Sequence, residues 1–582
     1  MKITLIEPKP PGKHVFNTVK MPRLGLPILG TILQQQGHEV NIVYGTHRNV
    51  RVSDLAGCHL IGISSTTSTA PLAYHLADFV RSQGIPVVMG GPHVSFQVEE
   101  ALQHCDYVIR GEGDTTFPAL VESLARGEAP LGVRGVSFYH NGELIHTPSG
   151  PWADVGGIPY PEISIFGGVK LSTYPVMTSR GCPYNCTFCS VTPMFGHKTR
   201  CRSIDAILQE LEQYKGKQVF FVDDNFTANS ARAKALMRAI IEHNVVPRRW
   251  FAQVRTEAAR DDELLKLMRD SGCGYVYVGM ESVNPKTLQS YNKHQQVSDI
   301  EYCIKRFHDY GIMVHGMFVF GSDEDTAQTI EQTVKFACEN KIDTVQFLIL
   351  TPLPGTRTFT DLKETGRILT YDWSNYDAHH VVFNPLNMSP QELQVETVKA
   401  FKQFYSFANI FKNVWVSGWR SVAFRALGYW LVRQWEKENK WYYQALDDMC
   451  SSNTFSNPLN QQPHVIKVIK NRLLSIELVS EGTAAVAKVT GKLGDTSMSK
   501  TIKSFLKALN STYQNLLIDA GDLTFVSETA LVRFMNALNR ATVKAHQTIV
   551  RLPLSHKRLF ELMAMYDIEI PTYVIREAVP EP

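Results

Sequence analysis

The sequence has few of the features of a secreted or membrane protein. Only ten of its 582 residues are cysteine, too few in a chain of this length for the disulfide framework of small secreted domains. Its first residues, Met1 to Glu7, are typical of a strand and not of a signal peptide. No uncharged apolar run reaches the ~18 residues of a membrane span. We therefore expect a cytoplasmic protein.

An excess of either charge is also missing. The chain has 59 lysines and arginines against 56 acidic residues, a net charge of +3. This is too small to indicate nucleic acid or another strongly charged partner. The hydrophobic share of 44% and charged share of 20% are ordinary for a globular protein. At ~150 residues per domain, the length predicts about four domains.

Three of the cysteines stand together on one segment. The C-x3-C-x2-C spacing places Cys182, Cys186 and Cys189 directly after a short apolar strand at 174–177. Thiolates are soft ligands that suit iron–sulfur clusters or zinc. Three thiolates can hold three irons of a [4Fe–4S] cluster and leave the fourth iron open for a substrate or cofactor.

The alternative for this segment is a zinc knuckle. His197 or Cys201 would then provide the fourth ligand. Zinc loops usually repeat a C-x2-4-C pair, and the sequence has no second pair. The spacing, with Phe188 just before the last cysteine, instead resembles the radical SAM superfamily, in which the open iron chelates S-adenosylmethionine (SAM).

Residues 1–145 alternate apolar strands with helical patterns. Strands are expected at 3–6, 40–44, 60–64, 87–89 and 107–109, with helices at 25–36, 70–83, 98–104 and 116–125. This alternation predicts an α/β domain with a parallel, doubly wound, Rossmann-like sheet, whose ligands lie at the carboxyl ends of the strands. Three loops rich in glycine and hydroxyl groups follow these ends, where the backbone can approach a large ligand closely. They contain Ser64, Ser65, Thr66, Gly90, Gly91, His93, Gly111, Glu112 and Gly113.

This region resembles the cobalamin-binding domain that precedes many radical SAM domains. The motifs are Gly25-Leu-Pro, Gly90-Gly-Pro-His and Arg110-Gly-Glu-Gly. The resemblance implies that the three loops hold cobalamin. The D-x-H-x-x-G motif that gives cobalt a histidine ligand in other B12 proteins is missing, so we expect no such ligand, and we expect His93 to bond the backbone of its loop. The alternative is a Rossmann-like domain without a cofactor.

Residues 146–170 are rich in proline and glycine and are expected to form a linker. Between 171 and 370 the alternation resumes, with further strands expected at 219–222, 250–253, 275–278, 314–319 and 344–350. About six βα units predict a partial TIM barrel with its chemistry at the carboxyl ends of the strands. The family resemblance implies that residues at those ends bind SAM, namely Phe188, Asp223, Asp224, Asn225, Gln253, Arg255, Glu281, Gly321 and Glu324.

Residues 371–450 are rich in aromatic side chains. Five tryptophans are interleaved with six basic residues, namely Trp415, Trp419, Trp430, Trp435 and Trp441 with Lys412, Arg420, Arg425, Arg433, Lys437 and Lys440. One interpretation is a helical cap packed over the mouth of the barrel. The other is an interfacial helix, or a pocket for an apolar, lipid-like substrate, with weak peripheral membrane contact.

A polar linker at 451–463 precedes a last α/β unit, 464–582. Through Val489-Thr-Gly-Lys-Leu and the segment 517–526 it resembles the STAS domain, which implies a regulatory protein partner. The family's regulatory phosphoserine is replaced by Glu528 in our alignment. A fixed carboxylate could mimic the phosphorylated state.

Together these resemblances imply a cobalamin-dependent radical SAM enzyme with a [4Fe–4S] cluster, SAM and cobalamin as cofactors. We expect it to methylate an unactivated carbon of a hydrophobic or lipid-like small molecule, through a 5′-deoxyadenosyl radical and methylcobalamin, with electrons from a flavodoxin or ferredoxin. One alternative is a cyclase or oxidase that uses cobalamin without methyl transfer. Another is a redox-sensing regulatory protein that acts through its STAS-like domain.

Overall fold

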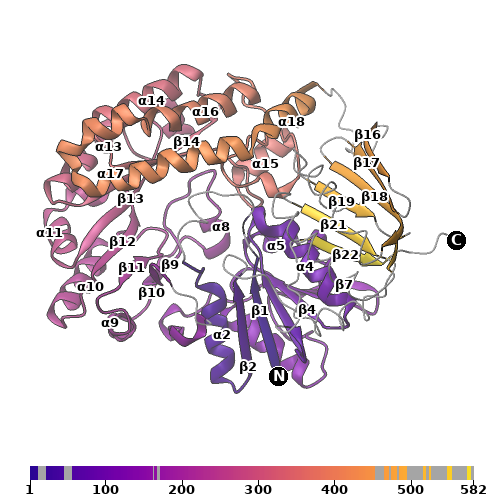
Figure 1. Cartoon of the computed structure of the whole chain (residues 1–582). Helices are drawn as coiled ribbons and strands as arrows, with labels where there is room; N and C mark the ends of the chain where they lie inside the picture. Colours follow the sequence, from indigo (N-terminus) through magenta and orange to yellow (C-terminus); the bar gives the residue numbers. More distant parts are fainter. Residues whose placement is uncertain are drawn as a thin grey trace.

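The computed structural model describes residues 1–8, 10, 21–44, 55–161, 163–166 and 171–451, and the backbone of seven strands between 464 and 577. Within these ranges, side chains are described up to residue 450, apart from 163, 166, 411–421, 423 and 448. The α/β pattern of residues 464–582 also predicts helices at 496–510, 528–545 and 555–566, and these helices, with Glu528, lie outside the described residues. Figure 1 shows an α/β chain whose N-terminal sheet lies beside a second, helix-covered sheet.

The N-terminal sheet has the strand order β2-β1-β3-β4-β5-β6-β7, and its first five strands are parallel. They are β1 (Lys2–Glu7), β2 (Glu39–Tyr44), β3 (Leu60–Ser64), β4 (Val87–Gly90) and β5 (Tyr107–Ile109). The accompanying helices are α2 (Gly25–Gln35), α4 (Ala70–Ser82), α5 (Pro92–Phe96), α6 (Val98–Ala101) and α7 (Gly113–Ala125). Ile6 and Ile63 belong to the same buried cluster as residues of α4, whereas Ile3 and Leu5 pack with residues of α2 and α7. The sheet is therefore covered on both faces.

Two further strands, β6 (Val136–His140) and β7 (Glu143–His146), extend this sheet as an antiparallel hairpin. Their connection is Asn141-Gly142, and both residues have positive φ, 51° and 84°. A two-residue Asn-Gly turn of this kind matches the twist of the strands it joins. The sequence analysis did not predict this hairpin, although the Asn-Gly pair is a recognised signal for it.

The second sheet has six parallel strands in the order β15-β14-β13-β12-β11-β8. They are β8 (Tyr174–Val176), β11 (Gln218–Phe221), β12 (Arg249–Val254), β13 (Cys273–Glu281), β14 (Met313–Phe320) and β15 (Thr344–Ile349). The connecting helices are α8 (Val191–Phe195), α9 (Ile204–Glu212), α10 (Ser230–Glu242), α11 (Asp262–Asp270), α12 (Pro285–Ser290), α13 (Val297–Asp309), α14 (Ala327–Glu339) and α15 (Arg357–Glu364). Among the described strands, β8 and β15 are the unpaired edges, so the sheet is consistent with the predicted partial TIM barrel.

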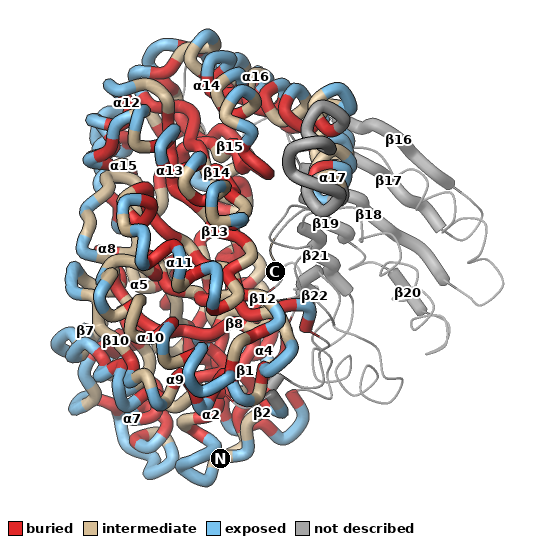
Figure 2. Tube along the Cα trace, turned by 90° about the vertical axis from the view of Figure 1, so that its left-hand side faces the viewer, coloured by how far each residue is buried: buried red, intermediate tan, exposed pale blue. Residues whose placement is uncertain are grey.

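The two faces of this sheet differ. Successive side chains of a strand point to opposite faces, and those packed against the helices are buried. Figure 2 shows the buried strands of this sheet beside helices that carry many of the exposed residues. The strand register places a second set of side chains on the face turned away from these helices, which we call the inner face. It includes half-buried side chains at Phe220, Phe251, Gln253, Tyr277, Met317 and Leu348. Apart from Gln253, they present mainly apolar or aromatic surface.

Three helices follow the barrel: α16 (Pro390–Phe404), α17 (Phe407–Glu438) and α18 (Lys440–Ser451). The buried Arg425 of α17 donates to the carbonyl oxygens of Ile342 and Asp343, just before β15 begins. Further along α17, Trp435 packs against His380. The backbone carbonyl of Ala378, two residues before His380, accepts a hydrogen bond from the N–H of Ile349 at the end of β15.

Helix α17 is therefore held against the segment before β15 by Arg425, whose guanidinium is buried against backbone carbonyls. The ring of Phe424 on the same helix lies 6.2 Å from that of Tyr275 on β13, so α17 reaches beyond the edge strand. A cap over the barrel mouth stays a prediction. Because of its contact with the carbonyls, Arg425 is buried, and it is not one of the exposed basic side chains that the second interpretation of this segment requires. Within the described ranges, no helix combines the length and hydrophobicity that crossing a bilayer requires.

The C-terminal strands form a separate mixed sheet in the order β16-β17-β18-β19-β21-β22, with β20 also paired to β18. The strands are β16 (His464–Lys470), β17 (Leu474–Glu481), β18 (Ala484–Leu493), β19 (Asn515–Asp519), β20 (Leu523–Phe525), β21 (Gln547–Leu552) and β22 (Tyr573–Glu577). The pairs from β16 to β18 are antiparallel, and those from β18 to β22 are parallel. The resemblance to a STAS domain stays a prediction.

Candidate functional site

The three-cysteine loop leaves the barrel at the carboxyl end of β8. At its base, β9 (Ser179–Arg180) pairs with β10 (Arg200–Cys201) in a short antiparallel ladder. Cys182, Cys186 and Cys189 are all partly exposed on the loop that this ladder closes. The loop therefore has a fixed base and accessible cysteines.

Asp223, at the end of β11, holds the beginning of this loop. Its carboxylate is buried and accepts hydrogen bonds from the backbone N–H groups of Thr178 and Ser179, at 2.7 and 3.0 Å. Its other oxygen accepts the hydroxyl groups of the same two residues. Sequence reasoning placed Asp223 near SAM but gave it no role in positioning the loop.

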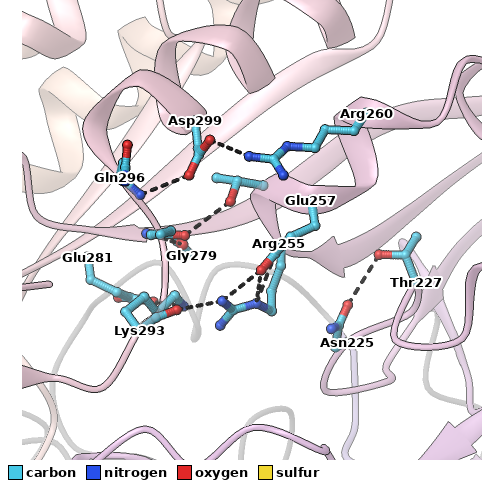
Figure 3. Close-up of polar contacts among 12 residues, drawn as sticks. Asn225, Thr227, Arg255, Glu257, Arg260, Gly279, Glu281, Lys293, Gln296 and Asp299 are labelled. Carbon is cyan, nitrogen blue, oxygen red and sulfur yellow. Dashed lines mark hydrogen bonds and ion pairs between the residues drawn. The ribbon is translucent and has the colours of Figure 1, made fainter. Parts of the chain in front are cut away.

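Arg255, after β12, supports the middle of the loop. Its guanidinium lies 3.8 Å from the ring centroid of Tyr184, between the first two cysteines. The same guanidinium donates to the carboxylate of Glu257 and to the backbone oxygen of Lys293, the latter at 2.6 Å (Figure 3). These contacts fix a cation beneath the cysteine loop.

Glu281 ends β13 in an uncommon backbone conformation, with φ at 61°. Its carboxylate accepts a hydrogen bond from the Lys293 ammonium at 2.5 Å, and both side chains are buried. A Cβ atom at Gly279 would lie 2.6 Å from the Glu281 carboxylate. Positive φ at a residue other than glycine costs free energy and persists where surrounding contacts enforce it. Sequence reasoning did not identify Lys293.

The chemistry of the cysteine loop fits an iron–sulfur cluster. Burial raises the pKa of the Cys189 thiol to about 12, with smaller contributions from the neighbouring Cys186 and Asp224. A thiol of this kind becomes a thiolate when it binds a metal, because the cation compensates the buried charge.

The placement of the donors separates the two metal hypotheses. In the described part of the chain, no three His, Cys, Asp or Glu side chains are placed to share one metal ion. A zinc knuckle needs four donors around a single ion. The three thiolates of a four-iron cluster each bind a different iron and need not meet at one point. The loop therefore fits a cluster better than zinc with His197 or Cys201.

The predicted SAM residues lie mostly at the carboxyl edge of the barrel sheet, but their exposure differs. Phe188, Asp224 and Gln253 are partly exposed, and Glu324 is exposed. The others are buried, namely Asp223, Asn225, Arg255, Glu281 and Gly321. Gly321 has φ at 100° and donates to the buried Asp325, which turns the chain after β14. Direct contact of each residue with SAM stays a prediction.

The nine residues predicted to hold cobalamin fall into two groups. Six are partly exposed at the carboxyl edge of the N-terminal sheet: Ser64, Thr66, Gly90, Gly91, Gly111 and Gly113. Three are buried and engaged by other parts of the protein: Ser65, His93 and Glu112. The first group is the part of the set that a ligand could reach directly.

His93 corrects one expectation. Its ring does not bond the backbone of its loop, because Nε2 lies 3.3 Å from a carboxylate oxygen of Glu100. The indole N–H of Trp373 donates to the same carboxylate, and the two rings meet edge to face with centroids 5.0 Å apart. His93 thus takes part in a contact between the N-terminal sheet and the segment after the barrel.

Gly91 gives a direct test of the cobalamin loops. Its φ is 103°, and an added Cβ would lie 2.5 Å from the backbone oxygen of Ser65. We expect Gly91→Ala to destabilise the protein by about 3 kcal/mol and to weaken binding of hydroxocobalamin, measured by thermal unfolding and absorbance titration. Gly90→Ala is the control, since its Cβ would meet no atom nearer than Ile109, at 3.9 Å. Equal binding by both variants would contradict the prediction.

The carboxyl edges of the two sheets face each other. Gly355, after β15, packs so closely on Phe96 of α5 that a Cβ would lie 2.5 Å from its ring. Arg180, at the base of the cysteine loop, makes two hydrogen bonds to Asp114, after β5. The loops predicted for cobalamin and the cysteine loop are therefore direct neighbours.

Comparison with protein families agrees with this arrangement. Residues 18–121 match the B12 binding domain, and residues 176–337 match the radical SAM superfamily. The chain is 33% identical over 430 residues to an uncharacterized methyltransferase of Pyrococcus horikoshii, covering 70% of this chain and 92% of that protein. It is 28% identical to the bacteriochlorophyllide d C-12(1)-methyltransferase of Chlorobaculum tepidum, covering 62% and 78%. It is 25% identical to the hopanoid C-3 methylase of Methylococcus capsulatus, covering 70% and 80%.

The fold is also that of a solved enzyme. The methyltransferase TsrM from Kitasatospora setae, with cobalamin and a [4Fe–4S] cluster bound, superposes with a TM-score of 0.55 at 18% identity, covering 73% of this chain and 90% of that one. The protein is thus an enzyme whose cofactors are SAM, a [4Fe–4S] cluster and cobalamin. It belongs to the family of cobalamin-dependent radical SAM methyltransferases.

Proposed function

We propose that this enzyme methylates an unactivated carbon of a hydrophobic small molecule, bound between the inner face of the barrel sheet and the N-terminal sheet. The observation that carries the proposal is the contact between the two carboxyl edges, through Arg180 and Asp114. It brings the cysteine loop and the cobalamin-binding domain together at one site.

The residues have distinct roles in this proposal. Cys182, Cys186 and Cys189 hold the cluster, with the loop anchored by Asp223. Arg255 carries its positive charge beside the loop. The partly exposed edge of the N-terminal sheet binds cobalamin. When bound, the cluster and SAM supply the hydrogen abstraction and cobalamin carries the methyl group, while the protein orients them and excludes water.

The inner face supports an apolar substrate. Five of its half-buried side chains present mainly apolar surface: Phe220, Phe251, Tyr277, Met317 and Leu348. Burial lowers the pKa of His315, on the same face, to about 4, so this histidine is neutral at physiological pH. These five side chains suit a substrate that is mostly hydrocarbon. The relatives named for a bacteriochlorophyllide and a hopanoid support the same class.

The decisive experiment follows the methyl group. The protein is purified without oxygen, reconstituted with cluster and cobalamin, and reduced by a flavodoxin or ferredoxin. It is then incubated with a lipid extract from a deletion strain and with SAM that carries deuterium in its methyl group. A hydrophobic product that carries the intact labelled methyl group supports the proposal. A modified product without the label would favour the cyclase or oxidase alternative.

The proposal also includes weak peripheral contact with a membrane. On α17, Phe424, Leu427 and Trp430 are 54%, 42% and 54% exposed, and apolar side chains of this kind can enter the edge of a bilayer beside basic residues. We expect flotation of the protein with anionic liposomes at low salt and less flotation of Trp430→Ala. Tyr139→Ala, which removes an equally exposed aromatic ring from β6, should float like the wild type. No flotation of the wild type at low salt would refute this contact.

The C-terminal sheet is proposed to bind a regulatory protein, as its resemblance to the STAS domain implies. Residues 464–582 follow the last helix of the catalytic part, α18. Affinity capture with the full-length protein and with a chain ending at 451 would identify a partner that requires this region. Recovery of the same proteins by both chains would argue against the assignment.

A further inference from the structure

Four charged residues join the N-terminal sheet to the base of the cysteine loop. They are Glu112, Asp114, Arg180 and Arg200, and we call them the interdomain ion cluster. Arg180 makes hydrogen bonds to both oxygens of Asp114, at 2.6 and 3.2 Å. Arg200 makes hydrogen bonds to both oxygens of Glu112, at 2.8 and 2.5 Å. Each arginine therefore has its own bidentate carboxylate partner, the strongest common form of ion pair.

The arginines occupy a particular place in the cysteine loop. Arg180 on β9 and Arg200 on β10 are directly opposite each other in the ladder that closes the loop. Two like charges in opposite positions of a ladder repel each other. The two carboxylates of the N-terminal sheet neutralise this pair, so the closed base of the loop depends on residues of the other domain.

The cluster is largely shielded from water. The side chains of Glu112, Asp114, Arg180 and Arg200 are 2%, 9%, 12% and 19% exposed. The ring of Trp152 lies over the Arg200 guanidinium, at 5.3 Å. Ion pairs in such surroundings are screened much less than surface pairs, and the loss of one partner leaves an uncompensated charge.

The linker also enters this cluster. The backbone N–H of Ala153 donates to Glu112 at 2.7 Å, and Arg200 donates to the carbonyl oxygen of Ala153 at 2.9 Å. One carboxylate thus binds the N-terminal sheet, the crossing segment and the cysteine loop to each other. The sequence had suggested that Glu112 binds cobalamin. In the structure both of its carboxylate oxygens are already occupied by these hydrogen bonds.

We propose that the interdomain ion cluster sets the distance between the cobalamin-binding edge and the cysteine loop, so that Glu112 and Asp114 are positioning residues for methyl transfer from SAM to cobalamin. This inference rests on the proposed placement of both cofactors. SAM cleavage takes place on the barrel side of this contact, whereas transfer of its methyl group to cobalamin needs both domains in register. A displacement of about 1 Å is enough to reduce such a step by about 100-fold.

The test needs no knowledge of the substrate. Full-length protein with cluster and hydroxocobalamin is reduced with titanium(III) citrate and given SAM. S-adenosylhomocysteine measures methyl transfer to cobalamin, and 5′-deoxyadenosine measures cleavage at the cluster. We expect Asp114→Asn to lower the ratio of the two products about tenfold or more, and Arg180→Lys, which keeps the charge but not the paired hydrogen bonds, to lower it less.

A second readout is independent of activity. Hydrogen–deuterium exchange of the cofactor-free Asp114→Asn chain should be faster than in the wild type at 150–155 and 180–202. The control is Arg126→Gln, which removes an arginine paired with two exposed carboxylates, Glu122 and Glu128, on the same domain. Its product ratio and exchange should match the wild type.

The outcomes are distinguishable. An unchanged product ratio in Asp114→Asn, or a parallel fall of both products at constant ratio, would overturn the inference, as would unchanged exchange in both segments. A wild-type protein that binds no cobalamin or cleaves no SAM would instead overturn the proposed function on which the inference rests.

Discussion

Replacing Cys182, Cys186 or Cys189 with alanine should reduce SAM cleavage by more than about 100-fold, since changing even the partners of metal ligands costs 10–100-fold. Each cysteine would hold a different iron, so the loss of any one thiolate leaves a second iron without its protein ligand. The measurements are iron and sulfide content, the absorbance of the cluster, and 5′-deoxyadenosine formed from SAM under reducing conditions.

The control for this prediction lies next to the loop. Cys201 is partly exposed in β10, opposite Ser179, and Cys201→Ser should keep the cluster and its activity. Loss of metal in Cys201→Ser, or full iron content in any of the three alanine variants, would contradict the assignment. Zinc in place of iron in protein purified without oxygen would do so as well.

Asp223→Ala should have the second largest effect, although Asp223 lies beneath the loop. The change leaves two backbone N–H groups and two hydroxyl groups in the buried site without their acceptor. Each unsatisfied buried group costs about 1–3 kcal/mol, so we expect about 4 kcal/mol of lost stability and a cysteine loop that no longer retains its cluster. Chemical denaturation and iron content measure the two effects.

Asp223→Asn separates the hydrogen bonds from the charge. An asparagine oxygen can accept both backbone N–H groups, and its NH2 group can donate to hydroxyls that rotate to accept. We expect this variant to keep most of its iron and to lose less than about 2 kcal/mol. If asparagine is as damaging as alanine, the negative charge of Asp223 matters more than its hydrogen bonds, and our account of the loop is wrong.

The fold and the central motif could be predicted because their signals are local. Three cysteines within eight residues define the loop, and the alternation of apolar strands and helices defines the two parallel sheets. The parallel strands of these two sheets were each predicted within a few residues, since buried parallel strands are short apolar runs between helical patterns. The Asn141-Gly142 hairpin was a local signal that was overlooked.

The contacts between distant segments could not be predicted in the same way. Asp114 and Arg180 are separated by 66 residues, and Glu100 and Trp373 by 273. Glu112 and His93 were assigned to a ligand because their loops follow strand ends, where ligands usually bind. In the fold, the same strand ends meet a second sheet, and the charged and aromatic side chains serve that contact. A single sequence has no pattern that distinguishes these two uses.

The anchoring of α17 has a consequence for how a large molecule could enter and leave. Arg425 cannot leave the carbonyl groups of Ile342 and Asp343 without exposing unpaired polar groups. Helix α17 and strand β15 should therefore move as one rigid body on the timescale of turnover, and neither can act as a lid. We therefore expect acceptor and product to pass on the side of β8, the other edge of this sheet among the described strands.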